Sequence, residues 1–384
     1  MKIQKIEVIR IAIPFESGRQ KKENAQQDYN AASPLLSKME TLLIKVHADN
    51  GLYGWGEAFG HLSNPVTFPA LENLVAPFFI GRTFSTTDDI ANIMQEAEVA
   101  LHGFGRTGPV RYALSAVDIA LWDLLGKQQQ LPLWKMLGAS RNRIGLYPSL
   151  VSYDNDPQAV ASKVREVFEL GYREIKLHET TWEAIAAARD VLGDRGELMV
   201  DVNCPWTPQE AFAHAQRLKP LNLQWLEEPV WPPEDVCGLA KVREAGVPLS
   251  AGENAAGDGD FFNLILQRAV DILQPSVSKV GGITAMLRVI ELAQTHGVKV
   301  VPHCFYYGAG MLATAHLVAM LPDNIRLEVP YIQWMPPLHD FLNYHPEMTL
   351  SDKPGLGFEP DESVIAAHLL ASAICSSAKG ERHA

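Results

Sequence analysis

Three acidic residues recur at an equal spacing in the middle of the chain. Asp201, Glu227 and Glu253 lie 26 residues apart, and each closes a short apolar run. Carboxylates that share one spot repel one another and raise one another's pKa unless a cation lies between them. An all-oxygen set suits a hard divalent ion, and Mg²⁺ is the natural candidate, with Mn²⁺ as an alternative. The other interpretation, three unrelated helix caps, is weaker because glutamate is a poor N-cap.

The same spacing predicts the elements that position these residues. A (β/α)₈ barrel uses roughly 250 residues for eight strand-plus-helix units, so one unit is about as long as this interval. Helical patterns such as 157–170, 207–218 and 283–296 separate the strand candidates. Those candidates are 144–149, 173–177, 197–202, 222–227, 247–252, 270–275, 298–303 and 325–329. Repeated units of this kind close into a parallel barrel, whose active site lies at the C-terminal ends of the strands.

The beginning of the chain has a different pattern. Apolar residues alternate over 3–13 as in a strand, which Pro14 is expected to end. Two further strand candidates, 40–47 and 52–58, flank Asn50-Gly51, which is a strong hairpin signal. The sequence therefore predicts a small antiparallel sheet before the barrel.

Helical patterns follow this sheet at 66–79, 88–102 and 109–129. Residues 16–38 are polar and are expected to form a long loop, which in compact domains usually has a function. At 384 residues the chain is long for a single domain. We expect an α+β domain over 1–130, a barrel over 131–350, and a C-terminal segment over 351–384 that packs back on the first domain.

Composition and charge limit the partners of this protein. The net charge of −12 argues against nucleic acid and anionic membranes, although a bound metal would still allow an anionic small substrate. The four cysteines lie far apart, which indicates free thiols in a reducing compartment. The N-terminus has no apolar signal core, and no apolar run is long enough to span a bilayer. The sequence therefore predicts a soluble, cytoplasmic protein.

Several motifs together resemble the enolase superfamily, and within it the mandelate racemase / muconate lactonizing group. They are Gly54-Trp55-Gly56-Glu57, residues 115–123, the three acidic motifs, Lys279-Val280-Gly281-Gly282 and His303. The resemblance implies an α/β fold with a (β/α)₇β barrel, a modified TIM barrel, and an α+β capping domain. It also implies that Asp201, Glu227 and Glu253 bind Mg²⁺, and that a base removes the proton α to a substrate carboxylate to give an enediolate. Because that proton is weakly acidic, the reaction needs concentrated positive charge.

The second barrel strand departs from the family pattern. The family usually has Lys-x-Lys there, whereas this chain has Lys176-Leu177-His178. The resemblance implies that Lys176 binds the substrate carboxylate. Alternation places His178 on the same face of the strand, where an imidazole can act as the base near neutral pH. A lone histidine is more often an inert core residue, but its place opposite Lys176 favours the catalytic interpretation.

The strand ends on the opposite side of the barrel also depart from the family pattern. His303 matches the family's histidine acid or base, but Ser276 stands where its usual aspartate partner would be. His303 therefore lacks the carboxylate that would raise the pKa of its ring. Glu328 matches the family's carboxylic acid at the end of the last barrel strand. If Glu328 is protonated, it could hydrogen-bond the enediolate intermediate. The alternative interpretation is that Glu328 forms an ion pair with Arg326.

Further residues are expected around this centre. Those predicted to support the metal ligands are Asn203, Glu228, Asn254 and Lys279. Arg19 and Trp55 are expected to contact substrate from segments that close over the barrel mouth. Lys21 and Lys22 would meet a distal carboxylate of a diacid, although a solvated charge run is the alternative.

The first functional hypothesis is an acid-sugar dehydratase, in which His178 removes the α-proton and His303 protonates the departing β-hydroxyl. The stretches 298–310 and 354–359 also resemble galactarolactone cycloisomerases, so ring opening of a sugar lactone is the second. Racemisation or epimerisation is third, because it needs a competent base on both faces. The alternative from another class is a non-catalytic protein that binds a metal and a sugar acid. The resemblance also implies a homo-oligomer, from a dimer to an octamer.

Overall fold

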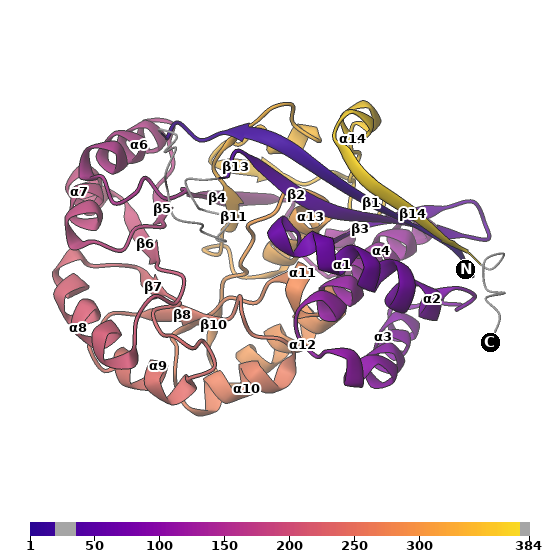
Figure 1. Ribbon diagram of the computed structural model, residues 1–384, viewed down its shortest axis with the longest axis horizontal. Helices are drawn as coiled ribbons and strands as arrows, with labels where there is room; N and C mark the ends of the chain where they lie inside the picture. Colours follow the sequence, from indigo (N-terminus) through magenta and orange to yellow (C-terminus); the bar gives the residue numbers. More distant parts are fainter. Residues whose placement is uncertain (20–35, 377–384) are drawn as a thin grey trace.

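An antiparallel sheet forms where the sequence predicted the first strands (Figure 1). The computed structural model describes residues 1–19 and 36–376. Within it, β1 (Ile3–Glu16), β2 (Lys38–Ala48) and β3 (Tyr53–Ala58) pair in that order. The predicted hairpin at Asn50-Gly51 joins β2 to β3, and Gly51 has a φ of 84°, a left-handed conformation that favours glycine.

The prediction that Pro14 ends the first strand is wrong. β1 continues to residue 16, and Pro14 stays in register with β2. Ala12 donates its backbone N–H to the carbonyl oxygen of His368, on the side of β1 that faces away from β2. The backbone nitrogen of Pro14, two residues later, faces the same side. On that side β1 passes from its pairing with β14 (Leu369–Ser376) to its pairing with β12 (Gln333–Trp334). No ladder therefore needs the N–H that proline lacks.

Helices close to the predicted ranges follow the sheet, and the longest packs against β3. They are α1 (Asn64–Ala70), α2 (Ala76–Phe79), α3 (Thr87–Leu101) and α4 (Pro109–Gln129). α3 begins with a capping box between Thr86 and Asp89, which satisfies free N–H groups of its first turn. α4 approaches β3 so closely that a Cβ on Gly56 would lie 1.9 Å from the Ala116 carbonyl oxygen. The glycines of the 54–57 motif are therefore required for packing.

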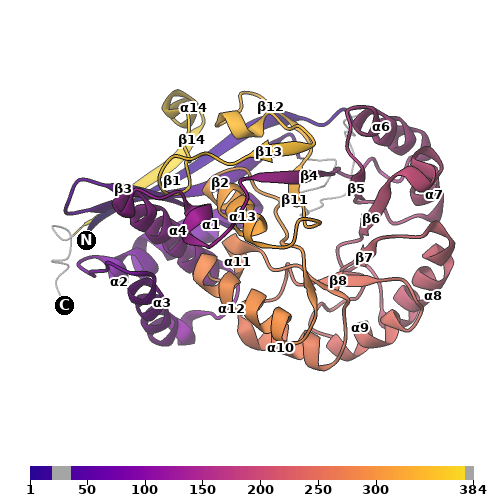
Figure 2. The same cartoon turned by 180° about the vertical axis from the view of Figure 1, so that it is seen from behind.

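From residue 143 onward the chain alternates parallel strands with helices that lie outside the curled sheet (Figures 1 and 2). The described parallel strands, in spatial order, are β11 (Leu327–Pro330), β4 (Arg143–Ser149), β5 (Glu174–Leu177), β6 (Glu197–Asp201), β7 (Trp225–Glu227), β8 (Leu249–Ala251), β9 (Ile272–Leu273) and β10 (Lys299–Val300). The main helices are α6 (Pro157–Glu169), α7 (Trp182–Leu192), α8 (Pro208–Leu218), α9 (Val236–Arg243), α10 (Asp258–Leu266), α12 (Gly282–Thr295) and α13 (Ala309–Met320). This is the predicted α/β architecture, a modified TIM barrel with an antiparallel capping sheet.

Several barrel strands are shorter than predicted. β9 and β10 have only two residues each. Ser276 and His303 lie beyond their ends and are joined by an isolated parallel bridge. Glu253 likewise follows β8 by two residues. The residues that could do chemistry are therefore held at strand ends and in the first residues of the loops, which is where barrel enzymes keep their active sites.

The C-terminal part of the chain returns to the N-terminal sheet. β12 and β14 both pair antiparallel with β1, and α14 (Glu362–Ala367) precedes β14. Asp123 of α4 accepts hydrogen bonds from the backbone N–H groups of Trp55 and Leu356, both at 2.8 Å. This carboxylate ties β3, α4 and the C-terminal segment together. The boundaries at residues 130 and 350 stay a prediction.

The described helices contain none with the length and apolar character needed to cross a membrane. The longest of them, α4, is buried along most of its length between the capping sheet and the barrel, which explains its apolar sequence.

Candidate active site

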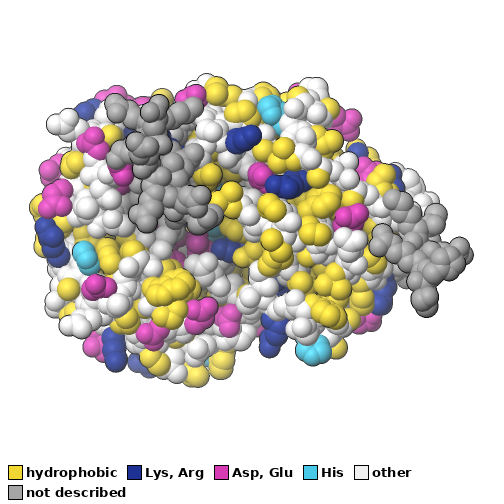
Figure 3. All heavy atoms as spheres, in the orientation of Figure 1, with side chains coloured by type: hydrophobic (Ala, Val, Ile, Leu, Met, Phe, Trp, Pro, Cys, Tyr) yellow, Lys and Arg dark blue, Asp and Glu magenta, His cyan; other side chains and the backbone are white. Residues whose placement is uncertain are grey.

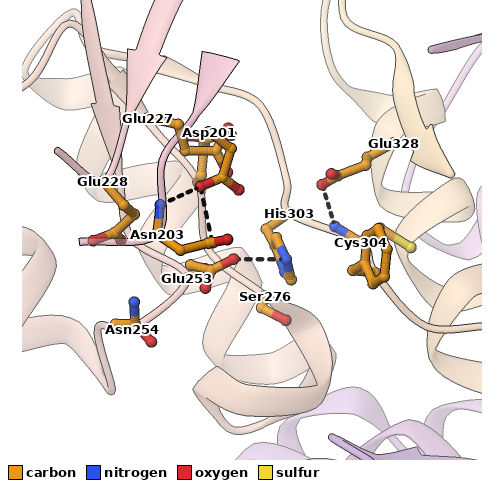
Figure 4. A network of polar contacts seen from close by, with 12 residues as sticks. Asp201, Asn203, Glu227, Glu228, Glu253, Asn254, Ser276, His303, Cys304 and Glu328 are labelled. Carbon is orange, nitrogen blue, oxygen red and sulfur yellow. Dashed lines mark hydrogen bonds and ion pairs between the residues drawn. The ribbon is translucent and has the colours of Figure 1, made fainter. Parts of the chain in front are cut away.

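The three acidic residues predicted as metal ligands converge at the C-terminal edge of the barrel sheet (Figure 4). Asp201 ends β6, and it pairs directly with Glu227 at the end of β7. One carboxylate oxygen of each of the three lies within 4.8 Å of the other two. Their side chains are at most 15% exposed. We call Asp201, Glu227 and Glu253 the carboxylate triad.

The triad concentrates negative charge where little water reaches. Desolvation by burial, followed by the charge of Asp201, raises the pKa of Glu227 well above its usual value. Burial also acts to raise the pKa of Glu253, but His303 and Lys279 hold that pKa well below its usual value. A divalent cation would relieve the repulsion, and three carboxylate oxygens are the ligands that Mg²⁺ prefers. The residues present therefore fit a magnesium ion.

Lys176 lies beside the triad, as predicted. Its buried Nζ is 2.9 Å from Glu227 and 3.3 Å from Asp201. A third carboxylate, Glu328, lies 2.6 Å away. Burial alone would lower the pKa of Lys176, but the three carboxylates raise it well above its usual value. Lys176 is therefore a permanent cation at the edge of the triad.

His178 directly follows β5, and its ring points toward the carboxylate triad. Its Nδ1 lies 2.5 Å from the carbonyl oxygen of Leu150, and its Nε2 lies 3.4 Å from Asp201 Oδ2. Because a carbonyl oxygen only accepts hydrogen bonds, Nδ1 carries a proton, and Nε2 presents its lone pair to the triad whenever the ring holds a single proton. The backbone thereby selects the tautomer that can remove a proton there.

His303 reaches the triad from the opposite side. Its Nε2 lies 2.8 Å from Glu253 Oε2, whereas its Nδ1 is buried and has no hydrogen-bond partner among the described residues (Figure 4). Ser276, its neighbour across the parallel bridge, donates its hydroxyl to Tyr306 Oη at 3.4 Å. Where the family has an aspartate this chain has Ser276, and His303 Nδ1 correspondingly has no hydrogen-bond partner among the described residues.

Glu328 differs from its predicted role. Burial acts to raise its pKa, but Lys176 and then His303 lower it, so the net shift is downward and the side chain is a carboxylate. It also accepts the backbone N–H of Cys304 at 2.9 Å. The alternative partner, Arg326, instead donates to Glu174 at 2.5 Å. Glu328 therefore acts as the counter-ion of Lys176, not as a protonated acid.

Two predicted supporting residues, Asn203 and Glu228, make hydrogen bonds at or next to the triad and have an unfavourable backbone conformation. Asn203 donates its side-chain amide to Asp201 Oδ1 at 2.9 Å, and Glu228 accepts the backbone N–H of Gly252 at 3.0 Å. Asn203, Cys204 and Glu228 all have a left-handed backbone, with φ of 52°, 57° and 47°. Such conformations cost about 1–3 kcal/mol each and persist where surrounding contacts hold them.

The other two supporting residues meet on the far side of Glu253. Lys279 Nζ lies 3.9 Å from Glu253 Oε1 and donates to Asn254 Oδ1 at 3.4 Å. The same ammonium group lies 4.6 Å from the centre of the Phe59 ring, which belongs to the capping part. Lys279 therefore connects a triad member to the cap.

Sequence reasoning missed several contacts of the site. Glu227 Oε2 accepts hydrogen bonds from Trp225 Nε1 and Gln274 Nε2, both at 2.9 Å. Strand alternation would have pointed to Trp225, two residues before Glu227, and the place of Gln274 at the end of a predicted strand would have suggested it. The carbonyl of Leu150 has no sequence signal, because every residue has one.

A cavity of about 420 Å³ opens over the triad. Its lining residues come from both parts of the chain and are Phe59, His61, Leu62, Ser63, Tyr112, His178, Asp201, Asn203, Cys204, Trp231, Pro233, Glu253, Asn254, Lys279, His303 and Phe305. Leu62 and Trp231 are 45% and 64% exposed, so they lie at its mouth. On the face shown in Figure 3, hydrophobic side chains are numerous over the capping elements and form a further group over the barrel, and charged side chains are scattered over both parts.

The structure does not bring the two predicted substrate contacts into this cavity. Arg19 donates to the carbonyl oxygen of Leu36 at 2.7 Å and is absent from the cavity wall. Trp55 packs edge-on against Phe358 and lines a separate cavity of about 570 Å³. Trp55 sits in β3 and faces the C-terminal segment, so the prediction that it faces substrate is corrected. Residues 21 and 22 lie outside the described residues.

Comparison with known proteins places this geometry in a family. A model described as enolase C-terminal domain-like matches residues 159–364, and the mandelate racemase / muconate lactonizing enzyme N-terminal domain matches residues 21–138. The L-talarate/galactarate dehydratase of Salmonella typhimurium is 31% identical over 337 residues, which cover 85% of this chain and 82% of that protein. The D-galactarolactone cycloisomerase of Agrobacterium fabrum is 28% identical over 364 residues, covering 88% and 93%.

A solved structure extends the comparison. L-talarate dehydratase from Polaromonas sp. JS666, complexed with Mg and L-glucarate, superposes with a TM-score of 0.80 at 26% identity, covering 98% of this chain and 99% of that one. Family models that together match most of the chain, and a barrel edge that carries the carboxylate triad, agree with each other. The chain belongs to the mandelate racemase / muconate lactonizing group of the enolase superfamily.

Proposed function

We propose that this protein catalyses Mg²⁺-dependent elimination of water from an acid sugar, which yields a 2-keto-3-deoxy acid. The observation that carries the proposal is the pair of histidines on either side of the triad. His178 Nε2 lies 3.4 Å from Asp201, and His303 Nε2 lies 2.8 Å from Glu253. The dehydratase relative and the relative that binds Mg and L-glucarate support an acid sugar as substrate.

Positive charge is the first requirement of this reaction. Asp201, Glu227 and Glu253 would hold Mg²⁺, which when bound supplies positive charge to the substrate carboxylate. Lys176 adds a second cation beside the triad, and its carboxylate neighbours keep it protonated. This charge lowers the cost of the negative charge that develops as the proton α to the carboxylate leaves.

The two histidines would then act once each. His178 removes the α-proton through Nε2, because the Leu150 carbonyl holds the proton of the neutral ring on Nδ1. The C–H electron pair forms a carbon–carbon double bond as the β-carbon–oxygen bond breaks. His303 gives a proton from Nε2 to the departing hydroxyl, which leaves as water. The resulting enol becomes the 2-keto acid by tautomerisation.

A second candidate is the opening of a sugar lactone, which the cycloisomerase relative supports. The same base removes the proton α to the carboxylate, and the leaving group is the ring oxygen, which His303 protonates without release of water. Racemisation is less well supported, because the carboxylate that faces His303 is the triad member Glu253 at Nε2, and the buried Nδ1 has no carboxylate partner among the described residues.

The test is a screen of acid sugars and their lactones with added Mg²⁺, read by semicarbazide detection of 2-keto acids and repeated in D₂O. Keto-acid formation from open-chain acids supports the dehydratase, and formation from lactones alone supports the cycloisomerase. Deuterium uptake without keto acid indicates epimerisation. If no compound reacts and no α-proton exchanges although ligands bind, the protein is a non-catalytic binder.

Variants separate the role of His178 from general damage to the fold. His178→Asn removes the base and should abolish both keto-acid formation and α-proton exchange. His214 is a matched control, because its ring stacks on Trp206 at 4.0 Å outside the cavity wall. His214→Asn should retain both reactions, and equal losses in the two variants would contradict the assignment of His178.

A further inference from the structure

Glu179 is a buried carboxylate that the chemistry above does not use. It directly follows His178 in the chain and is 1% exposed. It does not line the cavity over the triad, so a substrate bound there does not reach it. A buried carboxylate needs hydrogen-bond partners to offset the loss of water, and the partners of Glu179 show what it holds in place.

The hydrogen-bond donors that Glu179 has among the described residues all come from the loop after β4. Its two carboxylate oxygens accept the backbone N–H groups of Tyr153 at 2.5 Å and of Asn155 at 2.7 Å, and the Ser152 hydroxyl lies 3.5 Å away. Both oxygens therefore face donors, an arrangement that favours the ionised carboxylate. We call residues 150–155 the β4 loop.

A second contact ties the same two segments together in the opposite direction. Asn155 Oδ1 accepts the backbone N–H groups of Thr180 at 2.7 Å and of Thr181 at 2.9 Å. Asp154 and Asn155 have a left-handed backbone, with φ of 62° and 56°, which costs about 1–3 kcal/mol each and persists where surrounding contacts hold it. The conformation of the β4 loop therefore depends on such contacts, and the carboxylate of Glu179 is one of them.

The β4 loop carries the carbonyl group that orients the base. His178 Nδ1 lies 2.5 Å from the carbonyl oxygen of Leu150, the first residue of the loop. The start of the loop is anchored to β5, because Leu150 donates its backbone N–H to the carbonyl oxygen of Lys176 at 2.9 Å. Glu179 anchors the other end through Tyr153 and Asn155. The peptide group that follows Leu150 lies between these two anchors, so the direction of its carbonyl depends on both.

We propose that Glu179 is a positioning residue, which holds the β4 loop so that the Leu150 carbonyl meets His178 Nδ1 and Nε2 of that ring stays aimed at the substrate. This inference rests on the proposed function, because it assigns Glu179 a role in supporting the base. Glu179 itself touches neither the triad nor the cavity. A carboxylate that only stabilised the fold would leave the His178 ring unchanged, so the ring is what the experiment observes.

The experiment compares full-length Glu179→Gln with the parent protein, both saturated with Mg²⁺. Glutamine has nearly the same shape, but its amide group places a donor against a backbone N–H, so the β4 loop has to move. The first readout is NMR of protein with ¹⁵N-labelled histidine, in which the His178 signal is the one that His178→Asn lacks. The parent should show a proton on Nδ1. That proton should exchange with water up to about tenfold faster in Glu179→Gln, the upper end for one lost neutral hydrogen bond.

The second readout is turnover of arabinonate, xylonate, gluconate and galactarate. For an acid that reacts, kcat should fall about 10–100-fold in Glu179→Gln, since misplacing a catalytic group by about 1 Å can cost about 100-fold. KM should stay the same, because no residue of the β4 loop lines the cavity. Exchange of the α-proton in D₂O should fall by the same factor as kcat, because both need the base.

Asp123→Asn is the matched control. Asp123 is also a buried carboxylate that accepts two backbone N–H groups, both at 2.8 Å, but it joins α4 to the C-terminal segment and does not line the cavity. Asp123→Asn should lower stability in urea unfolding without changing either readout. Should Glu179→Gln fail to fold, Glu179→Asp takes its place, because the shorter side chain draws the β4 loop inward and should produce the same two changes.

The outcomes separate this inference from the proposed function. A folded Glu179 variant in which the His178 Nδ1 proton exchanges as in the parent overturns the inference, whether or not turnover falls. Faster exchange with an unchanged kcat also overturns it, and so do equal changes in Asp123→Asn. If the parent converts no acid sugar and exchanges no α-proton, the proposed function fails. The NMR comparison then decides by itself whether Glu179 positions the ring.

Discussion

Replacing Ser276 by aspartate should give the Nδ1 atom of His303 a carboxylate partner. Ser276 and His303 face each other across a parallel bridge, where neighbouring backbones lie about 4.8 Å apart and side chains project to the same face. Ser276 is 1% exposed and His303 is 4% exposed, so a new carboxylate would have little water around it. The Tyr306 hydroxyl lies 3.4 Å from Ser276 Oγ and donates to the His303 carbonyl oxygen at 3.2 Å, so it would have to turn in order to donate to the new carboxylate.

The size of the effect follows from this geometry. A carboxylate in contact with an imidazole raises the imidazole pKa by about 1–3 units, which stabilises the imidazolium by about 1.4–4 kcal/mol. His303 in Ser276→Asp should therefore retain its proton to higher pH than in the parent protein. It should also become a competent base on its own face, so that exchange of the α-proton with solvent deuterium appears on that face of the substrate.

The assay is a titration of the His303 ring by NMR with labelled histidine, together with stereochemical analysis of deuterium uptake. Ser276→Asn is the matched control, because it has nearly the same shape as aspartate without the charge. The reasoning is refuted if folded Ser276→Asp shifts the His303 midpoint by no more than Ser276→Asn does. It is also refuted if the midpoint rises but no deuterium is incorporated on the second face.

Three further perturbations follow. Removing Mg²⁺ with EDTA should lower the melting temperature, since a ligand at a hundred times its Kd adds about 2.7 kcal/mol to the free energy of unfolding. Asp201→Asn should abolish this response, and a melting temperature that does not depend on Mg²⁺ would contradict the metal site. Gln274→Leu removes a 2.9 Å hydrogen bond to Glu227 and should weaken Mg²⁺ binding by about 10–100-fold in calorimetry, whereas unchanged affinity would exclude this support role. Burial raises the pKa of Glu57 from 4.5 to about 7, so the stability that its neutral form adds is complete below pH 4.5 and is lost as the pH rises towards 7. Glu57→Gln should remove about 3 kcal/mol of this pH dependence in urea unfolding, and an unaltered slope would show that another group is responsible.

The sequence predicted those parts of the site whose positions follow from the regular spacing of the strands along the chain and from the alternation of side chains within a strand. Asp201 and Glu227 end neighbouring parallel strands in direct register, so their equal spacing translates into proximity. Lys176 and His178 are two residues apart, and alternation alone puts them on one face. The same argument fails for strands of two residues, where Ser276 and His303 are positioned by an isolated bridge and the following loops.

Contacts made across the fold were beyond sequence reasoning. Arg326 and Glu328 share a face by alternation, yet Arg326 pairs with Glu174 and Glu328 pairs with Lys176. The partner of Glu328 therefore depends on which residue of β5 lies at its level in the barrel, and the nearer residue in sequence proved to be the wrong one. Trp55 belongs to a family motif, but its ring faces the C-terminal segment, whose path no local pattern fixes. The tautomer of His178 depends on a main-chain carbonyl, which has no signature in the sequence.

The two departures from the family pattern, His178 and Ser276, have a joint consequence. A racemase needs two bases of similar strength, because each must return the proton that the other removes. Here the Leu150 carbonyl fixes one ring as a proton acceptor at Nε2, while the second ring presents Nε2 to Glu253 as a proton donor and has no described partner on Nδ1. Elimination uses one base and one acid once in each turnover, so it tolerates this inequality. Either departure alone weakens a two-base mechanism, whereas together they leave an unequal pair that is sufficient for elimination.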